Sequence, residues 1–393
     1  MIPVPDVVIV GAGFAGSVVA RELAQRADKT VLVIEKRRHI GGNAYDHLDA
    51  AGVLVHDYGP HIFHTESQRV FEYLSRYTSW RDYQHQVVAN IHGRYIPVPF
   101  NLNSIELSFD HYKAQQLVTR LIETYGEGRK VPIIELRDQA DPLLTELADY
   151  VYENVFLGYT KKQWGVTPEE VDPSVTARVP VLVGRDNRYF QDTWQGMPLN
   201  GYTALFEALL DHHNITVCTG TDARQLLRFE TNGKTGEDGP FTNILFNDKP
   251  FNGEVIYTGA LDQLCEHRFG ILPYRSLDFE FKTLPVKHIL PCGTVNYTVS
   301  EEYTRITEFT WLTGQDLDVT TIMEEYPCGY EALPGQIPYY AIINEENNRH
   351  YQRYLALFSE LANFHVVGRL AEYRYYNMDH IVKRALELAD ELC

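Results

Sequence analysis

A glycine triplet near the N-terminus restricts the fold more than any other feature of this chain. The β-branched run Val7–Val10 leads into Gly11, Gly13 and Gly16, which have the spacing G-x-G-x-x-G, and a segment of helical character follows from Ser17 to about Ala27. Strand, glycine turn and helix in this order predict the first half of a βαβ unit. The expected class is therefore α/β, with a Rossmann-like domain at the N-terminus.

The second half of the unit supplies the acid that a dinucleotide site needs. A second apolar run, Val31–Ile34, ends on Glu35, 19 residues after Gly16. In such a unit Gly11 permits the tight turn, Gly13 lets the backbone approach a pyrophosphate, and the last glycine allows the helix to pack closely on the strand. Glu35 would accept hydrogen bonds from the ribose hydroxyls. A dinucleotide site is predicted here, rather than a glycine turn without a ligand.

The residues after Glu35 favour FAD over NAD. The basic turn and glycine pair of 36–43, and the strand and glycine of 254–259, resemble the two motifs of flavoproteins of the glutathione-reductase-like and amine-oxidase-like kinds. No second G-x-G-x-x-G occurs, so a dedicated NAD(P)H domain is not expected and a reductant would come from outside. The FAD contacts predicted in these motifs are Gly11, Gly13, Phe14, Ala15, Gly16, Glu35, Lys36, Arg37, Gly42, Asn43, Thr258 and Gly259.

Charge and composition exclude several classes of protein. The 35 Lys and Arg against 53 Asp and Glu give a net charge of −18, which argues against nucleic-acid binding because that depends on clustered cations. The 5 cysteines are scattered without metal or dithiol spacing, as expected of a reduced cytoplasmic protein. No apolar run is long enough to span a membrane, and no signal peptide is expected.

Hydrophobic periodicity divides the rest of the chain. Helical stripes over 109–125 and 143–155 predict a helical insertion, whereas alternating runs between about 240 and 312 predict an antiparallel sheet with one solvated or ligand-facing side. The expected organisation is a first FAD-binding part at 1–75, sheet strands at 76–104, a helical domain with a lid loop at 105–180, a return at 181–240, a substrate-binding sheet at 241–345 and a final FAD-binding part at 346–393, which ends in a helix from about Met378 to Leu392.

A long loop is expected directly after the helical region. Three prolines between 165 and 181 forbid a regular element, and loops of this length often cover an active site. The one arginine in this loop, Arg178, could be carried to an anion.

Several motifs identify a family. The sequence resembles the bacterial type of UDP-galactopyranose mutases along essentially its whole length, and the segments that carry the resemblance are Gly59–Thr65, Pro99–Asn103, Gly158–Trp164, Ala177–Pro180, Tyr303–Glu308, Pro338–Tyr340 and Gly368–Tyr376. The resemblance implies interconversion of UDP-galactopyranose and UDP-galactofuranose with reduced FAD and no net redox change, begun by attack of flavin N5 on the anomeric carbon. It also implies a homodimer and a role in cell wall biosynthesis.

Family position also assigns roles to individual residues. Arg178 and Arg305 would grip the diphosphate, and His61 and His64 would lie against the flavin and set its protonation. The other implied substrate contacts are Phe156, Tyr159, Thr160, Trp164, Tyr189, Asn296, Tyr339 and Tyr375, with Tyr340 an alternative to Tyr339. The other implied cofactor contacts are Gly59, Arg369, Tyr375 and Met378. His56, His61 and His64 lack the neighbours of a metal site, and no metal is predicted.

Two departures from the family pattern and two other functions remain open. Asn377 stands where the family commonly has Asp, and Val155 replaces a common Phe beside Phe156. An FAD-dependent oxidase of the amine-oxidase-like type would share the fold but needs an apolar channel instead of converging arginines and tyrosines. A non-catalytic FAD protein would need neither the lid nor the phosphate donors.

Overall fold

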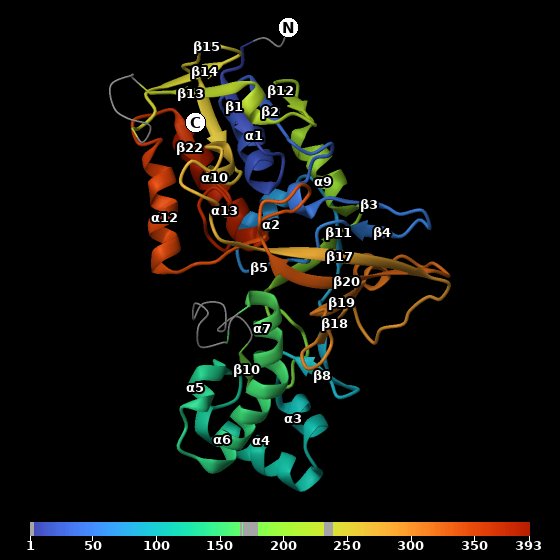
Figure 1. Ribbon diagram of the computed structural model, residues 1–393. Coiled ribbons are helices and arrows are strands. Elements are labelled where there is room, and N and C mark those ends of the chain that lie inside the picture. The colour runs from blue at the N-terminus through green and yellow to red at the C-terminus, as the bar shows by residue number, and fades with distance from the viewer. Residues whose placement is uncertain (1–3, 166, 168–179, 232–238) are drawn as a thin grey trace.

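The computed structural model describes residues 4–165, 167, 180–231 and 239–393. Figure 1 shows three regions one above the other: an α/β region that holds both termini, a long curved sheet across the middle, and a group of helices at the far end. The chain passes between these regions several times, so each contains segments that are distant in the sequence. The predicted α/β class with a Rossmann-like domain is confirmed.

The α/β region is built on a parallel five-stranded sheet in the order β12-β2-β1-β16-β22. Its central strand pairs with both neighbours in register, Val7 opposite Val31 on one side and Glu254 on the other. Because β1 and β2 are almost fully buried on both faces, they consist entirely of apolar residues, whereas the edge strand β12 is partly exposed. The strands are β1 (Val7–Val10), β2 (Val31–Ile34), β12 (Ile215–Cys218), β16 (Glu254–Tyr257) and β22 (Phe364–Val366).

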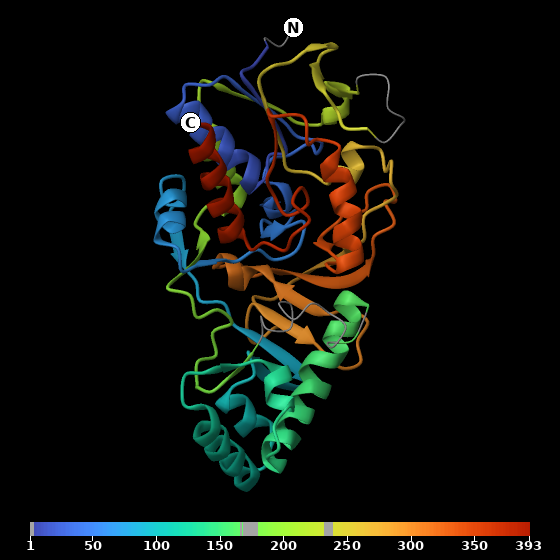
Figure 2. The ribbon, with the colours of Figure 1, turned by 90° about the vertical axis from the view of Figure 1, so that its left-hand side faces the viewer.

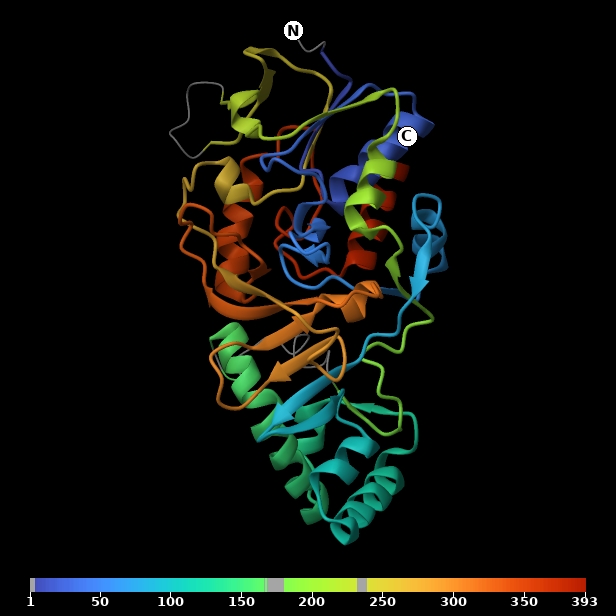
Figure 3. The ribbon, with the colours of Figure 1, turned by 90° about the vertical axis from the view of Figure 1, so that its right-hand side faces the viewer.

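Helices cover both faces of this sheet. Alternation along β1 sends Val7 and Ile9 into a core with helices α1, α9 and α13, and Val8 into a second core with α10 and α12. Figures 2 and 3 show α1 and α13 side by side, with α12 on the other side of the sheet. The helices are α1 (Phe14–Arg26), α9 (Gly201–Leu210), α10 (Leu261–Leu264), α12 (Glu345–Ala356) and α13 (Met378–Leu392).

The middle region is a seven-stranded, mainly antiparallel sheet in the order β21-β17-β20-β19-β18-β7-β8. Its register places Asn296 opposite Arg305, Arg305 opposite Glu325, and Glu325 opposite Phe279. Residues directly opposite each other share a face, so these four form one row across the sheet. The strands are β7 (Val87–Ile91), β8 (Arg94–Val98), β17 (Tyr274–Leu284), β18 (Thr294–Tyr297), β19 (Arg305–Glu308), β20 (Thr320–Gly329) and β21 (Tyr340–Ala341).

The helical insertion shares one apolar core with strands β7 and β8 of the middle sheet. Its last helix is continuous through three parts, with a π-helical turn at Tyr152–Leu157 between α6 and α7. Side chains of Asp110 and Asp141 cap α4 and α6, as helix N-termini favour. The helices are α3 (Leu102–Ser108), α4 (His111–Tyr125), α5 (Ile133–Arg137), α6 (Pro142–Val151) and α7 (Gly158–Trp164).

The smaller elements complete the fold. They are the strands β3 (Asp46–Leu48), β4 (Leu54–His56), β5 (Phe63–Thr65), β6 (Trp80–Asp82), β9 (Lys130–Val131), β10 (Val181–Leu182), β11 (Trp194–Pro198), β13 (Leu227–Glu230), β14 (Asn243–Phe246) and β15 (Lys249–Pro250), and the helices α2 (Gln68–Leu74) and α11 (Phe309–Thr313).

The single antiparallel sheet predicted between about 240 and 312 is corrected by the structure. The run at 243–246 lies in a separate three-stranded sheet, and the run at 254–257 is β16 of the parallel sheet. The run that begins at Arg305 is a strand only to Glu308 and continues as helix α11. The alternation of apolar and polar residues within a strand does not reveal which strand it pairs with. The same pattern therefore occurs here in strands of three different sheets.

Candidate active site

One cavity of about 640 Å³ lies at the carboxyl ends of the parallel strands. This is the edge at which open α/β sheets bind ligands. Fourteen of the predicted cofactor contacts line it: Gly11, Gly13, Phe14, Ala15, Glu35, Lys36, Arg37, Gly42, Asn43, His61, Thr258, Gly259, Arg369 and Met378. The structure therefore brings together both predicted FAD motifs and the start of α13. Of the other predicted contacts, Gly16 packs beneath the turn, and Gly59 and Tyr375 lie outside the cavity lining.

The three glycines of the turn are required for different reasons. A Cβ on Gly11 would lie 2.0 Å from Thr258 Oγ1, and a Cβ on Gly16 would lie 1.9 Å from the Gly11 carbonyl oxygen. Both are therefore needed by the protein's own packing. A Cβ on Gly13 meets nothing closer than 3.6 Å, although Gly13 lines the cavity. The fold itself could accommodate a side chain at this position. We therefore infer that the absence of a side chain at Gly13 leaves room for a ligand.

Charged and polar groups at the mouth of the turn fit a dinucleotide. Glu35 accepts hydrogen bonds from the backbone N–H groups of Ala12 (2.9 Å) and Arg37 (2.8 Å), which hold its carboxylate at the end of β2. The Arg37 guanidinium lies 4.2 Å from the ring centre of Tyr58 and donates to Asn43, while its buried Nη1 has no partner within the described parts of the chain. A buried cationic donor without a partner matches an anionic ligand such as a pyrophosphate.

His61 lines the cavity as a neutral imidazole. Its Nδ1 lies 2.8 Å from the Gly59 carbonyl oxygen, so Nδ1 carries the proton and Nε2 is an acceptor. Its backbone N–H donates to His56 Nδ1 at 3.1 Å. Burial lowers the pKa of both histidines to about 3. His61 can accept a hydrogen bond in the cavity, but it does not hold a positive charge near neutral pH.

These two histidines, of which His56 is buried and His61 half-buried, predict acid sensitivity. Their pKa of about 3 in the folded state lies below the ordinary 6.5, so between these values the unfolded chain binds more protons and the folded state loses stability as the pH falls. Each histidine should contribute a loss of about 1.4 kcal/mol per pH unit. Urea unfolding of the wild type and of His56→Gln at pH 6 and pH 5 measures the change in unfolding free energy with pH. We expect this change to be smaller in the variant by about 1.4 kcal/mol per pH unit. Equal changes in both proteins would contradict the lowered pKa of His56.

A second group of side chains surrounds Arg305. Its Nη2 donates to the Tyr159 hydroxyl at 3.1 Å, and both Nε and Nη2 lie 3.1 Å from Glu325 Oε1. Burial alone would lower the pKa of Arg305, but Glu325 outweighs this and the pKa is raised well above its ordinary value. The arginine is therefore a permanent cation at this site, and Tyr159, whose pKa is raised by burial, remains a hydroxyl donor.

Helix α7 carries Tyr159 and is fastened to the sheet at three points. A Cβ on Gly158 would lie 2.0 Å from the Thr298 carbonyl oxygen, so only glycine allows this close approach to the end of β18. The Lys162 ammonium donates to three carbonyl oxygens of the loop 297–303. Arg275 donates to the carbonyl oxygens of Lys162 and Gln163 at the helix C-terminus. The sheet therefore sets the position of Tyr159 relative to Arg305.

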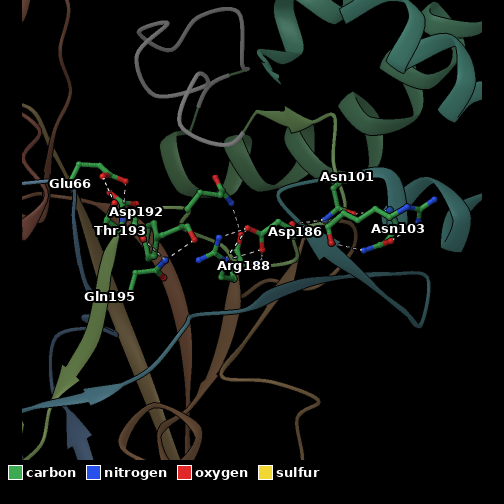
Figure 4. Close-up of polar contacts among 11 residues, drawn as sticks. Glu66, Asn101, Asn103, Asp186, Arg188, Asp192, Thr193 and Gln195 are labelled. Carbon is green, nitrogen blue, oxygen red and sulfur yellow. Dashed lines mark hydrogen bonds and ion pairs between the residues drawn. The ribbon is translucent and has the colours of Figure 1, made fainter. Parts of the chain in front are cut away.

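The segment that carries Tyr189 has no regular structure, and side-chain hydrogen bonds hold it instead. Figure 4 shows Asn101 bonded to the Asp186 backbone, the ion pair of Arg188 with Asp186, and Thr193 on Glu66. The Tyr189 N–H donates to the His85 carbonyl oxygen at 2.7 Å. This brings Tyr189 to the helical core beside the site, against the ring of His85.

Other predicted substrate contacts cluster around Tyr340. Its ring is stacked on Tyr375 with centres 5.6 Å apart, and Trp164 lies 5.7 Å away. Arg369 lies 5.3 Å from the same ring, so Tyr340 stands between the cavity and the tyrosine group. Tyr339 packs edge-on against Phe279 instead. The structure thus places Tyr340, which the motif left as an alternative, beside Tyr375 and Trp164.

The remaining predicted residues divide into three kinds. Thr160 is buried in α7, and Phe156 is buried in the helical core together with Val155. His64 does not line the cavity: its ring stacks on Phe190 at 3.6 Å and its Nδ1 lies 3.2 Å from Asp192. His64 lies in β5 and His61 in the loop before it, and an odd spacing along extended chain sends two side chains to opposite sides. Arg178 lies outside the described residues.

Two residues that sequence reasoning missed belong to this group. Glu325 is the partner of Arg305, and His85 is buried beside Tyr189, with a pKa lowered to about 3, first by burial and then by the charge of Arg305. Neither lies in a recognisable motif. A glutamate in a strand and a lone histidine carry no local signal, so only the strand register and the packing reveal them.

Comparison with known proteins decides the family. The family model for UDP-galactopyranose mutase matches residues 154–375, which include α7, the row of Asn296, Arg305 and Glu325, and the tyrosines described above. A model for an NAD(P)-binding Rossmann-like domain matches residues 9–77. The chain belongs to the UDP-galactopyranose mutase family. The protein is therefore an isomerase of this family.

Relatives of this family member match it over nearly their whole length. A probable UDP-galactopyranose mutase from Klebsiella pneumoniae is 35% identical over 391 residues, covering 98% of this chain and 94% of its own. A UDP-galactopyranose mutase from Mycoplasma pneumoniae is 33% identical, covering 98% and 96%. A dTDP-fucopyranose mutase from Escherichia coli is 34% identical, covering 98% and 97%.

Solved structures agree on the fold of this family member. A reduced UDP-galactopyranose mutase superposes with a TM-score of 0.69 at 17% identity, covering 100% of this chain and 94% of its own. A putative protoporphyrinogen oxidase from Exiguobacterium gives 0.62 at 14% identity, covering 98% of each chain. The fold is thus shared with oxidases. Within the described residues, no helix is long and apolar enough to cross a membrane, and no three potential metal ligands come together.

Proposed function

We propose that this protein interconverts UDP-galactopyranose and UDP-galactofuranose with reduced FAD bound in the 640 Å³ cavity. Bound FAD would supply a nucleophilic nitrogen to the anomeric carbon of the sugar, without net oxidation or reduction. The observation that carries the proposal is the arrangement of a cationic arginine and several hydroxyl donors next to a dinucleotide cavity. Such a group is suited to a departing diphosphate and unsuited to the apolar substrate channel of an oxidase.

The residues of the chain have distinct tasks in this proposal. Arg305 and Tyr159 would bind the diphosphate through charge-assisted and neutral hydrogen bonds, and Arg178 would add a second guanidinium. Tyr340 and Tyr375 separate this group from the cofactor cavity and would orient the sugar. His61, neutral and acting as an acceptor, would face the flavin without adding positive charge. The N-terminal turn of α13, which begins at Met378, would stabilise an anionic reduced flavin.

The redox requirement of the reaction tests the proposal. Purified protein is incubated with UDP-galactofuranose, with and without dithionite, and the nucleotide sugars are separated. We expect UDP-galactopyranose to form with the reduced flavin and not with the oxidised one. Equal conversion by the oxidised flavin, or oxidation of the sugar with consumption of oxygen, would contradict the proposal and favour the oxidase alternative.

A second substrate is favoured by one of the relatives. The dTDP-fucopyranose mutase matches this chain as well as the UDP-galactopyranose mutases do, at 34% identity against 33 to 35%. Its named substrate carries the same diphosphate group between a different nucleoside and a different sugar, and Arg305 and Tyr159 would bind that shared diphosphate. The assay therefore includes dTDP-fucopyranose in a parallel reaction, and the ratio of kcat/KM values decides between the two substrates.

A further inference from the structure

The row of Asn296, Arg305, Glu325 and Phe279 across the central sheet contains a negative charge, which does not help to bind a diphosphate. Glu325 lies directly opposite Arg305 on the adjacent strand, and its side chain is 2% exposed, compared with 23% for Arg305. A carboxylate beside a diphosphate repels it. The presence of a buried carboxylate here calls for a role other than attraction of the substrate.

The contacts of Arg305 indicate that role. One oxygen of Glu325, Oε1, lies 3.1 Å from both Nε and Nη2, and Nη2 also donates to Tyr159. Two of the three guanidinium nitrogens are thus held from one side. These contacts along one edge restrict the orientation of the planar guanidinium.

Other groups also lie close to the Glu325 carboxylate. Thr304 donates through its hydroxyl to Oε1 at 3.5 Å, and the other oxygen, Oε2, lies 3.8 Å from the position of a Cβ on Gly59. Phe279, its neighbour in the row, packs against the same glycine. The carboxylate is therefore enclosed between Arg305, the loop before His61 and an aromatic ring.

We propose that Glu325 is a positioning residue: it holds the Arg305 guanidinium in the orientation that meets the diphosphate in the transition state, and it weakens ground-state binding of the same diphosphate. This inference rests on the proposed function, because it concerns the step in which the diphosphate departs. Interactions that favour the transition state over the bound substrate raise kcat rather than lower KM.

Glu325→Gln tests this role, with Glu324→Gln as the matched control. The amide keeps the shape of Glu325 but removes its negative charge, so the ion pair with Arg305 is reduced to a hydrogen bond from the guanidinium to a neutral oxygen. We expect kcat to fall about tenfold or more while KM does not rise, because the repulsion of the diphosphate is removed. Glu324, the preceding residue of β20, faces the opposite side and pairs with Lys282 at 2.6 Å, so its variant should stay within about twofold of wild type.

A double variant separates positioning from direct action. In the Arg305→Ala background, Glu325→Gln should change kcat/KM by less than about threefold, because two residues that act as one unit are not additive. A further tenfold loss in that background would overturn the proposal. So would an unchanged kcat in the single variant, or a raised KM with kcat unchanged.

Two measurements show whether a loss of activity comes from misfolding. Flavin absorbance per chain and the thermal unfolding midpoint report whether Glu325→Gln is folded.

Glu325→Asp serves as a second variant, because it keeps the negative charge but is too short to reach Nε of Arg305. It should show the loss in kcat with KM within twofold of wild type. If the wild type converts neither nucleotide sugar, the proposed function fails. If the wild type is active and both Glu325 variants match it, only this inference fails.

Discussion

Arg305→Ala is expected to lower kcat by at least about 100-fold while FAD remains bound, because removal of one preorganised donor from a developing charge costs about 2 to 3 orders of magnitude. The residue is a permanent cation held by Glu325 and Tyr159, and it lies outside the cofactor cavity. Turnover of UDP-galactofuranose with reduced enzyme, and flavin absorbance per chain, measure the two effects separately.

The control for this variant is an arginine that also forms an ion pair but lies on the surface, away from the candidate site. Arg228 pairs with Asp248 on the surface, and both side chains are mostly exposed. Arg228→Ala should leave turnover and flavin content unchanged, since exposed ion pairs contribute little. Arg178→Ala should resemble Arg305→Ala. Loss of flavin from either active-site variant would show a structural role instead.

Gly13→Ala is expected to produce a folded protein that has lost most of its FAD. The added methyl group lies at least 3.6 Å from every other atom near it, so the protein alone accommodates it. It projects at the cavity where the backbone should approach the pyrophosphate, and a loss of affinity of about tenfold or more should follow. Titration of the apo-protein with FAD, followed by flavin fluorescence, gives the dissociation constant.

Two other glycines provide controls for this experiment. Gly329 has nothing within 4 Å of its Cβ position and an ordinary φ, so Gly329→Ala should bind FAD like the wild type. Gly16→Ala should destabilise the protein itself, because its methyl group would overlap the Gly11 carbonyl oxygen. If Gly13→Ala bound FAD normally, the cavity would not hold a pyrophosphate at this turn.

Predictions from the sequence succeeded where a local pattern carries its own geometry. The turn at Gly11, the acid Glu35 and the helix from Met378 to Leu392 lie where the motifs indicated. Each depends on residues that are close together in the chain, whose spacing alone determines strand, turn and helix. The predicted helical insertion also agrees with α4 and α6, because amphipathic spacing is read within one helix.

Predictions failed or stopped where the outcome depends on pairing between distant segments. The run at 254–257 matched both an FAD motif and the alternating pattern of an antiparallel sheet, and only its pairing with β1 and β22 places it in the parallel sheet. The neutral state of His61 was likewise beyond the sequence, since burial by many distant residues lowers its pKa. Residues that define the site through packing, such as His85, left no signal in the sequence.

The sequence by itself determined the family and the dinucleotide turn, because motifs of fixed spacing encode them, and the family resemblance indicated Arg305 as the arginine expected to meet a diphosphate. Only the tertiary structure decided that Glu325 lies opposite Arg305, that Tyr340 stacks on Tyr375 and that His64 turns toward Asp192. The physical reason is that strand register and helix docking bring together residues tens to hundreds of positions apart. These residues form ion pairs and hydrogen bonds only when the fold has brought them to contact distance.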